Sequence, residues 1–404
     1  MAICISMEDS VEMPTVKWGS YISNFFRIWN FNERKWSIIT PENSYEKPSA
    51  RFGHSMDIYK NYIIVFGGSS AYNKTSKMRV WNKEIHVFDI YKQKWLTDFA
   101  KPSREVFTPR QRMYHASAVY GEWLVVHGGI NTDDKSVYDD IFLFNIQQQS
   151  WIGLSESKPL IELLGARHMH TMTVVLPFNL TGKEQEALWQ TTPNTPSSIL
   201  SSEFWGIYLF GGYKEGFGQT NDLWLIRPIL RAKPEGKSPS KKLQDTDAYS
   251  LEAIKLEPEG RPPVSRVLHS TVFFKNRYLI IYGGKSEEIY TSTKNLALND
   301  VWIYDIPNNK WEKLIMYGFH PNSRWGHCMT VFDKNQIVVF GGVNLNNYWD
   351  ISLSILNIPS KISKTKDESS DESSSKNPKP LKDFLRKLEL LSSEVKSKMK
   401  SFKQ

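Results

Sequence analysis

A pair of adjacent glycines recurs five times along the chain, each time after a short run of β-favouring apolar residues. The pairs are Gly67-Gly68, Gly128-Gly129, Gly211-Gly212, Gly283-Gly284 and Gly341-Gly342. An Arg-x-x-His motif precedes every pair, and successive pairs are 58 to 83 residues apart. Self-similarity at such intervals indicates that one small structural unit is built several times.

Each unit reads as four short strands. The motif histidine precedes the first strand, and Gly-Gly ends the second. A third run, such as residues 301–305, ends in an aromatic residue followed by Asp or Asn. A tryptophan six or seven residues after that aromatic opens the fourth strand, at Trp95, Trp151 and Trp311. We therefore expect repeated four-stranded antiparallel sheets, whose strands we call a, b, c and d in chain order.

The residue types suit small sheets arranged around an axis. Glycine tolerates close approaches that a β-carbon forbids, so paired glycines allow a sharp turn at a crowded centre. One tryptophan per unit can fill the space between neighbouring sheets, because a single sheet cannot bury both faces alone. Radial repetition of sheets gives a β-propeller. The pattern of an apolar run, Gly-Gly, aromatic-Asp and then Trp resembles the kelch repeat, over about residues 21–358. The resemblance implies an all-β, kelch-type β-propeller of four-stranded antiparallel blades.

Six segments match strand c, so we expect six blades. Residues 26–30 followed by Trp36 match strands c and d of a unit, and residues 350–355 match strand c near the other end. The alternative is a five-bladed propeller in which the N-terminal segment completes the last sheet. Either arrangement would pair the two ends of the repeat region and protect a sheet edge.

The remaining sequence defines the domain boundaries. We expect an N-terminal extension at 1–15, a propeller at 16–359, an acidic, Ser-rich flexible linker at 360–379, and a basic amphipathic or coiled-coil helix at 380–404. The third unit carries insertions at about 177–203 and 228–248 and lacks its Trp, so residues 249–254 are expected as its strand d. Apolar residues at heptad spacing make the C-terminal helix a candidate partner-binding or self-association element. They are Leu381, Phe384, Leu388, Leu391 and Val395. Docking of this helix on the propeller, or a frayed helix, remains an alternative.

Charge and cysteine content exclude several classes. The net charge is +8, but residues 360–404 hold 12 Lys/Arg and 7 Asp/Glu, which leaves the body nearly balanced. We therefore expect no nucleic-acid partner, and no apolar run is long enough to span a membrane. A membrane-surface role of the basic tail is not favoured, because acids interrupt it. The only cysteines are Cys4 and Cys328, which excludes a disulfide scaffold and fits a cytoplasmic protein.

The sequence predicts no catalytic centre. The five motif histidines recur in every unit, which is typical of structural residues, since a catalytic group is normally unique. They are His54, His115, His170, His269 and His327. No nucleotide-binding loop, nucleophile elbow or zinc-protease motif is present. We expect a non-enzymatic protein without cofactor or metal. A sugar- or small-molecule-processing propeller enzyme is the alternative.

The motif arginines are the candidate binding residues. In kelch proteins that act as substrate adaptors, arginines before strand a line the mouth of the central channel and engage acidic peptides. By resemblance, five arginines could do so here: Arg51, Arg112, Arg167, Arg266 and Arg324. Buried arginines bonded to neighbouring backbone are the other interpretation. The predicted function is a protein-interaction scaffold or adaptor that binds partner peptides through blade loops. A substrate adaptor of a ubiquitin ligase is a narrower alternative.

Overall fold

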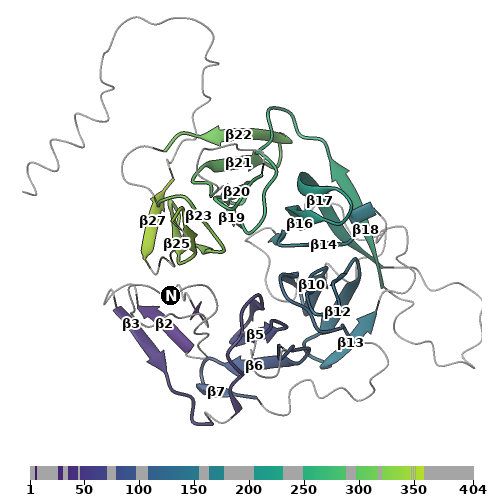
Figure 1. Ribbon diagram of the computed structural model, residues 1–404, viewed down its shortest axis with the longest axis vertical. Helices are drawn as coiled ribbons and strands as arrows, with labels where there is room; N and C mark the ends of the chain where they lie inside the picture. The colour runs from purple at the N-terminus through teal and green to yellow at the C-terminus, as the bar shows by residue number, and fades with distance from the viewer. Residues whose placement is uncertain are drawn as a thin grey trace, which may run out of the picture. The chain divides into compact units, whose positions relative to one another are not determined.

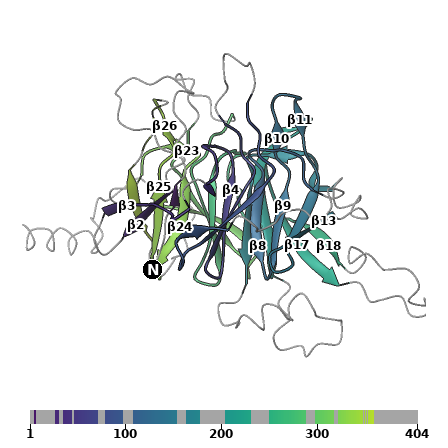
Figure 2. The same ribbon diagram turned by 90° about the horizontal axis from the view of Figure 1, so that it is seen from below.

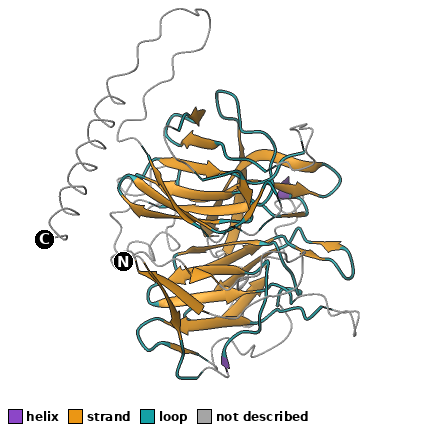
Figure 3. Ribbon diagram, turned by 60° about the vertical axis from the view of Figure 1, so that its left-hand side comes forward, coloured by secondary structure: helices purple, strands orange, loops and turns teal. Residues whose placement is uncertain are grey.

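The structure is a computed structural model that describes the following residues: 5–6, 26–30, 35–43, 46–70, 79–96, 108–153, 163–176, 204–230, 249–287, 297–316, 321–346, 348, 350 and 352–358. The chain divides into two compact units, Met1–Ile358 and Pro359–Gln404. The predicted linker and C-terminal helix, with its five heptad residues, lie outside the described residues. Strand accounts for nearly all regular structure of the described part (Figure 3). No helix in these ranges has the length and apolar composition needed to cross a membrane.

Five sheets built on the repeat follow one another around an axis (Figure 1). Blade 1 comprises β4 (Ser55–Tyr59), β5 (Tyr62–Phe66), β6 (Ile85–Asp89) and β7 (Lys94–Trp95). Blade 2 comprises β8 (Ala116–Tyr120), β9 (Trp123–His127), β12 (Ile141–Asn145) and β13 (Ser150–Gly153). Blade 3 comprises β15 (Thr171–Val175), β16 (Gly206–Lys214), β17 (Gly218–Leu230) and β18 (Tyr249–Leu256). Blade 4 comprises β19 (Ser270–Phe274), β20 (Tyr278–Tyr282), β21 (Val301–Asp305) and β22 (Lys310–Leu314). Blade 5 comprises β24 (Cys328–Asp333), β25 (Gln336–Phe340) and β27 (Leu353–Asn357).

The second strand of each blade shows why the sequence carries uninterrupted apolar runs. Strand β5 pairs with β4 and β6 and is packed on both faces by neighbouring sheets, so four successive side chains, Ile63 to Phe66, are buried. One face contributes Ile64 and Phe66 to a core cluster shared with blade 2. This two-sided burial replaces the apolar–polar alternation of a half-exposed strand.

Blade 3 departs from the expected unit. Strand β16 continues through Gly211 and Gly212, with a register shift at that point, and forms a long hairpin with β17. The expectation that Gly-Gly ends strand b is therefore wrong for this blade. Strand β18 provides the fourth strand, as the sequence predicts. Because β17 extends to Leu230, the second insertion begins later than 228; residues 177–203 and 231–248 lie outside the described residues.

The N-terminal residues form a separate three-stranded sheet: β1 (Ile5–Ser6), β2 (Phe26–Asn30) and β3 (Lys35–Ile39). It lies between blades 5 and 1, because Trp36 packs on Phe340 with 4.7 Å between ring centroids and Ile39 packs against the blade 1 cluster. The structure thus has five blades built on the repeat, as the alternative expected, rather than six. Among the described strands, the N-terminal segment forms its own sheet instead of completing the last blade, since β27 pairs with β25 and β2 with β1 and β3.

The loops leave the sheets at two opposite ends. The a–b and c–d turns are at one end. The b–c loops and the connections from strand d to the next blade are at the other, which we call the loop face. Two short ladders mark the loop face (Figure 2): β10 (Ile130–Asn131) with β11 (Ser136–Val137), and β23 (Arg324–Trp325) with β26 (Val343–Asn344). In blade 3 the corresponding segment β14 (Arg167–His168) pairs with β16.

Candidate functional site

The motif arginines bind within their own blades. The guanidinium of Arg266 is fully buried. Its Nη1 donates to the Gly283 carbonyl at 3.0 Å and to Asp300 Oδ1 at 2.8 Å, while Nη2 donates to Asp300 Oδ2 at 2.9 Å. Nε donates to the Val264 carbonyl. The arginine therefore joins the Gly-Gly turn, the start of strand c and the entry to strand a, and the paired charges hold the pKa of Asp300 below its usual value despite its desolvation.

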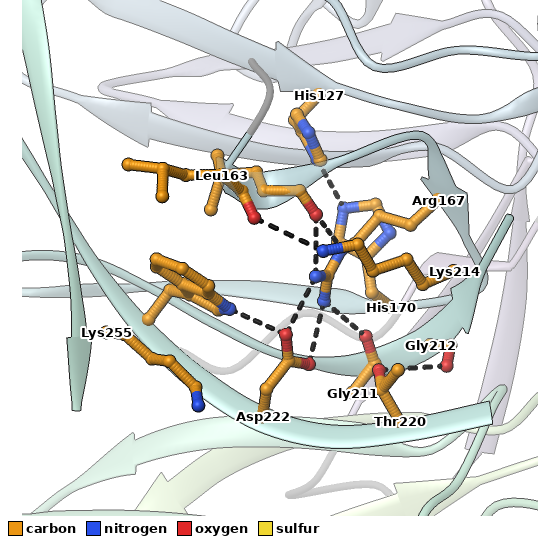
Figure 4. Close-up of polar contacts among 12 residues, drawn as sticks. His127, Leu163, Arg167, His170, Gly211, Gly212, Lys214, Thr220, Asp222 and Lys255 are labelled. Carbon is orange, nitrogen blue, oxygen red and sulfur yellow. Dashed lines mark hydrogen bonds and ion pairs between the residues drawn. The ribbon is translucent and has the colours of Figure 1, made fainter. Parts of the chain in front are cut away.

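The same arrangement recurs in three other blades. The carboxylate partners are Asp140 for Arg112, Asp222 for Arg167 and Asp350 for Arg324. Figure 4 shows the blade 3 example, in which Arg167 reaches both oxygens of Asp222 and the Gly211 carbonyl. Asp140 and Asp300 come directly before strand c, Asp222 lies within β17, and Asp350 comes three residues before β27. We did not identify them from the sequence, although an acid precedes that strand in every unit.

Blade 1 lacks the carboxylate contact. The residue before its strand c is Glu84, and Arg51 instead contacts His86 Nε2 at 3.2 Å, the Gly67 carbonyl and the Ser49 side chain. Desolvation lowers the pKa of Arg51 to about 10, and Glu84 opposes this shift. Among the described residues, Arg51 is therefore a buried cation without a bonded carboxylate partner.

This geometry corrects the expected role of the arginines. All five are 0 to 1% exposed, and their guanidinium groups are directed at protein atoms. An acidic peptide could reach them only by displacing the carbonyl and carboxylate partners, which leaves buried polar groups unpaired. Of the two interpretations, the second is correct: the arginines are buried and bonded to neighbouring groups. It holds for Arg51, Arg112, Arg167, Arg266 and Arg324.

The motif histidines lie at the seams between blades. The imidazole of His269 is hydrogen-bonded to Thr171 Oγ1 of the preceding blade at 3.0 Å and packs edge-on against Phe210. His115 repeats this arrangement with Ser55, at 2.9 Å, and Phe66. Burial in these seams lowers the pKa of both histidines well below 6.5. They are neutral side chains that pack between adjacent blades and hold them together. Their recurrence in every unit predicts such a structural role.

The seam between blades 2 and 3 holds two histidines. His127 occupies the place that Phe66 and Phe210 take elsewhere, and its Nδ1 lies 3.0 Å from Nε2 of His170 (Figure 4). Desolvation lowers the pKa of His127 to about 3. The neighbouring His168 instead stacks on Tyr213. No group of three or more His, Cys, Asp or Glu in the described ranges is arranged to hold a metal ion.

The turns between motif Arg and His form a hydrogen-bonded chain around the axis. The second residue after each arginine has a left-handed φ of 54 to 66°. These residues are Gly53, Tyr114, Met169, Leu268 and Gly326. The backbone N–H of each of the last four donates to the carbonyl of the residue before it in this series at 2.8 to 3.0 Å, from Tyr114 to Gly53 through to Gly326 to Leu268. The repeat thereby uses backbone as well as side chains to couple blades.

The loop face carries most of the exposed large apolar side chains among the described residues. Seven of the twelve are on its loops: Val80, Leu163, Tyr213, Phe217, Ile315, Leu345 and Tyr348. Phe217, at the tip of the β16–β17 hairpin, is 79% exposed and has the Lys214 ammonium over its ring. A polar cleft of about 460 Å³ lies on the same face, between the β10–β11 ladder and Glu215, and Arg110 and Lys135 also line it. These loops differ from blade to blade, unlike the buried motif residues.

The fold and the repeat geometry define a kelch-type β-propeller. The KLHDC2/KLHL20/DRC7 Kelch-repeats domain matches residues 19–180 and 192–361, which is most of the chain. The chain therefore belongs to this kelch-repeat family, as the resemblance predicted.

Curated relatives share the propeller at low identity. Acyl-CoA-binding domain-containing protein 5 of Arabidopsis thaliana is 23% identical over 75% of this chain, and protein ral2 of Schizosaccharomyces pombe is 21% identical over 80%. The matches cover 38% and 54% of those two proteins. Kelch domain-containing protein 1 of Homo sapiens is 26% identical over 52% of the chain and 39% of that protein. The chain thus spans about half or less of the length of these relatives.

Proposed function

We propose that this kelch propeller is a non-enzymatic scaffold that binds partner proteins through its loop face. The observation that carries the proposal is the gathering of exposed apolar side chains on the loops of that face, beside a polar cleft. Binding residues concentrate in loops held by a rigid framework, and aromatic side chains with a polar surround are typical of protein interfaces. Here the framework is the set of buried Arg–Asp pairs and histidine seams.

The proposed partner is a protein rather than a nucleic acid or a membrane surface, and the proposed location is the cytoplasm. The C-terminal residues 380–404 would add a second contact or self-association, and two linked contacts raise avidity without improving either alone. The arginine side chains have no part in this proposal, because they are bonded within the blades.

Affinity capture with the full chain tests the proposal. The wild type is compared with Phe217→Asp, on the loop face, and with Tyr91→Asp, which lies in the c–d turn at the opposite end and is 85% exposed. Both changes put a charge on an exposed turn, so both variants should fold. We expect stoichiometric protein partners that Phe217→Asp loses and Tyr91→Asp retains. Equal capture by all three proteins would contradict use of the loop face.

A further inference from the structure

The carboxylates of three Arg–Asp pairs accept a further hydrogen bond from the residue two positions after the aspartate. In blades 3 and 4 a tryptophan Nε1 donates to the carboxylate Oδ2 at 2.6 Å, and in blade 5 a backbone N–H donates to Oδ1 at 2.8 Å. The pairs are Trp224 with Asp222, Trp302 with Asp300, and Ser352 with Asp350. A donor other than the arginine is therefore a regular part of this arrangement.

Blade 2 has Phe142 at the corresponding position, and a phenyl ring has no N–H to donate. The ring still lies beside the ion pair, with its centroid 5.7 Å from the Arg112 guanidinium carbon. Among the described residues, the Asp140 carboxylate accepts only from Arg112. The Asp140 side chain is 29% exposed, against 17 or 18% for the other three aspartates. Asp140 thus presents acceptor capacity to solvent where its counterparts have a partner.

Asp140 lines the polar cleft of about 460 Å³ beside the β10–β11 ladder of the loop face (Figure 2). This volume falls within the range of small-molecule sites, roughly 300–1,000 Å³. Val137 is the only lining residue in the described part of the chain that has no polar side-chain atom. Because most small-molecule pockets have mainly apolar walls, this cleft fits a ligand that is polar over most of its surface.

The other charged residues of the cleft are balanced in sign. Arg110 and Lys135 can only donate hydrogen bonds, whereas Asp139 and Glu215 in their ionised forms only accept them. All four side chains are exposed, and within the described ranges none of them forms an ion pair or a side-chain hydrogen bond. Two positive and two negative groups are therefore available, which favours a ligand without net charge.

A hydroxyl group matches this lining, because it can donate one hydrogen bond and accept two. It can donate to Asp140, as the neutral indole N–H does in blades 3 and 4, and accept from Arg110 or Lys135. Since Arg112 already neutralises Asp140, the carboxylate needs a neutral donor rather than a second cation.

We propose that the cleft binds a neutral polyhydroxy ligand, a sugar or a cyclic polyol, with one hydroxyl donating to Asp140 and its neighbours bonded to the charged residues around it. Such a ligand supplies donors and acceptors side by side, so it can satisfy the carboxylates and the cations of the cleft together. This site goes beyond the proposed function, which uses the exposed apolar side chains of the loop face, so either can fail alone.

Isothermal titration calorimetry on the full-length protein tests the proposal. The probes are D-glucose, D-galactose, lactose and myo-inositol, and the zwitterionic dipeptide glycylglycine is the comparison. We expect saturable binding of at least one neutral probe and at least tenfold weaker binding of glycylglycine. Phe142→Trp introduces the indole donor found in blades 3 and 4, so it should occupy the Asp140 carboxylate and weaken sugar binding at least tenfold. Its thermal unfolding, compared with that of the wild type, shows whether the variant is folded.

Exposed residues of the cleft give variants that should fold in any case. Glu215→Ala removes an acceptor and Lys135→Ala removes a donor, so each should weaken binding at least threefold. Glu257→Ala is the matched control, because Glu257 is also an exposed carboxylate, with 79% of its side chain accessible, and does not line the cleft. It should bind as the wild type does.

Coupling the bound sugar to a carrier protein distinguishes the two sources of such a ligand. Binding of the free sugar alone identifies a small molecule, and binding of both forms identifies a glycan on a partner. Absence of saturable binding by all four neutral probes, or tighter binding of glycylglycine, would overturn the proposal. Unchanged binding by a folded Phe142→Trp protein, or by both Glu215→Ala and Lys135→Ala, would also overturn it.

Discussion

At the scale of single residues, the Arg–Asp pair is the most costly group to disturb. The sequence shows where the arginines recur, but the carboxylates that neutralise them lie 26 to 55 residues away. Local pattern alone cannot decide whether such an arginine faces solvent or a buried partner. The structure decides it, because four arginines have a carboxylate, whereas the fifth, Arg51, contacts His86 and carbonyl or hydroxyl oxygens among the described residues.

This difference predicts unequal costs of removing two equally buried arginines. Arg266→Met leaves the Asp300 carboxylate without its buried cationic partner, so the free energy of unfolding should fall by about 3–5 kcal/mol. Arg51→Met removes a desolvated cation and leaves only neutral acceptors without a donor, so the free energy of unfolding should fall by about 1–3 kcal/mol. Urea unfolding at pH 7, followed by tryptophan fluorescence, measures both. Equal losses would show that the carboxylate contributes nothing beyond the glycine carbonyl contact.

The buried histidines also make stability depend on pH. Desolvation lowers the pKa of His54 to about 4 and of His127 and His327 to about 3, while in the unfolded chain each titrates near 6.5. The unfolded state therefore binds more protons below pH 6.5, so stability is fully present above that pH and is lost as the pH falls. Asp57 opposes this trend, because desolvation raises its pKa to about 6, but it is one group against several.

We expect the free energy of unfolding to decrease steadily between pH 6.5 and 4.5. His127→Phe restores the aromatic residue found at this position in other blades and removes one titrating group. It should therefore reduce the slope by about 1.4 kcal/mol per pH unit. Denaturant unfolding at a series of pH values gives both slopes. A parallel shift of the curve without a change in slope would mean that His127 is already protonated in the folded protein.

At the scale of elements, the seams between blades are held by contacts that the repeat predicts only in part. The five glycine pairs are recognisable in the sequence, and so are the strands that flank them. The sequence does not show which glycine pair is covered by a neighbouring blade, because Gly283 and Gly341 occupy identical positions in their units. That depends on how the blades are arranged in space. Only the seam after blade 5 lacks the next turn among the described residues. The continuation of β16 through Gly211 is also not predictable from the local pattern, since the same Gly-Gly can end a strand or form a bulge within it.

The two glycines give a matched pair of substitutions. Their φ angles are 62° and 71°, so alanine introduces similar backbone strain at each, about 1–2 kcal/mol. At Gly283 the new methyl group would also lie 2.8 Å from the Arg324 carbonyl, whereas at Gly341 nothing described is closer than 3.7 Å. Gly283→Ala should therefore destabilise the protein by at least about 1–3 kcal/mol more than Gly341→Ala, as overpacking does elsewhere. Thermal or urea unfolding compares them directly, and a similar cost at both sites would indicate that the seam after blade 5 is covered.

At the scale of the whole molecule, the closure of the ring is the feature that the sequence predicts least well. The repeat predicts the propeller because each unit carries its own pattern, and the expected strands c and d of the N-terminal segment do form a sheet. The sequence does not decide between this arrangement and one shared last blade, because strand pairing between distant parts of the chain leaves no local signature. Trp36 on Phe340 and Ile39 on the blade 1 cluster show how the N-terminal sheet joins its two neighbours.

Closure through this sheet predicts that Trp36 supports the whole propeller rather than its own strand alone. Trp36→Ala removes the aromatic contact with Phe340, and because Trp36 is only partly buried we expect a loss of about 2 kcal/mol, below the range for fully buried aromatic residues. Tyr91→Ala, on an exposed turn, is the control and should cost less than about 0.5 kcal/mol. Hydrogen exchange read by mass spectrometry separates local from global effects. If the N-terminal sheet closes the ring, protection should decrease in β25 of blade 5 and β5 of blade 1 as well as in β3. A decrease confined to β2 and β3 would show that the five blades hold together without it.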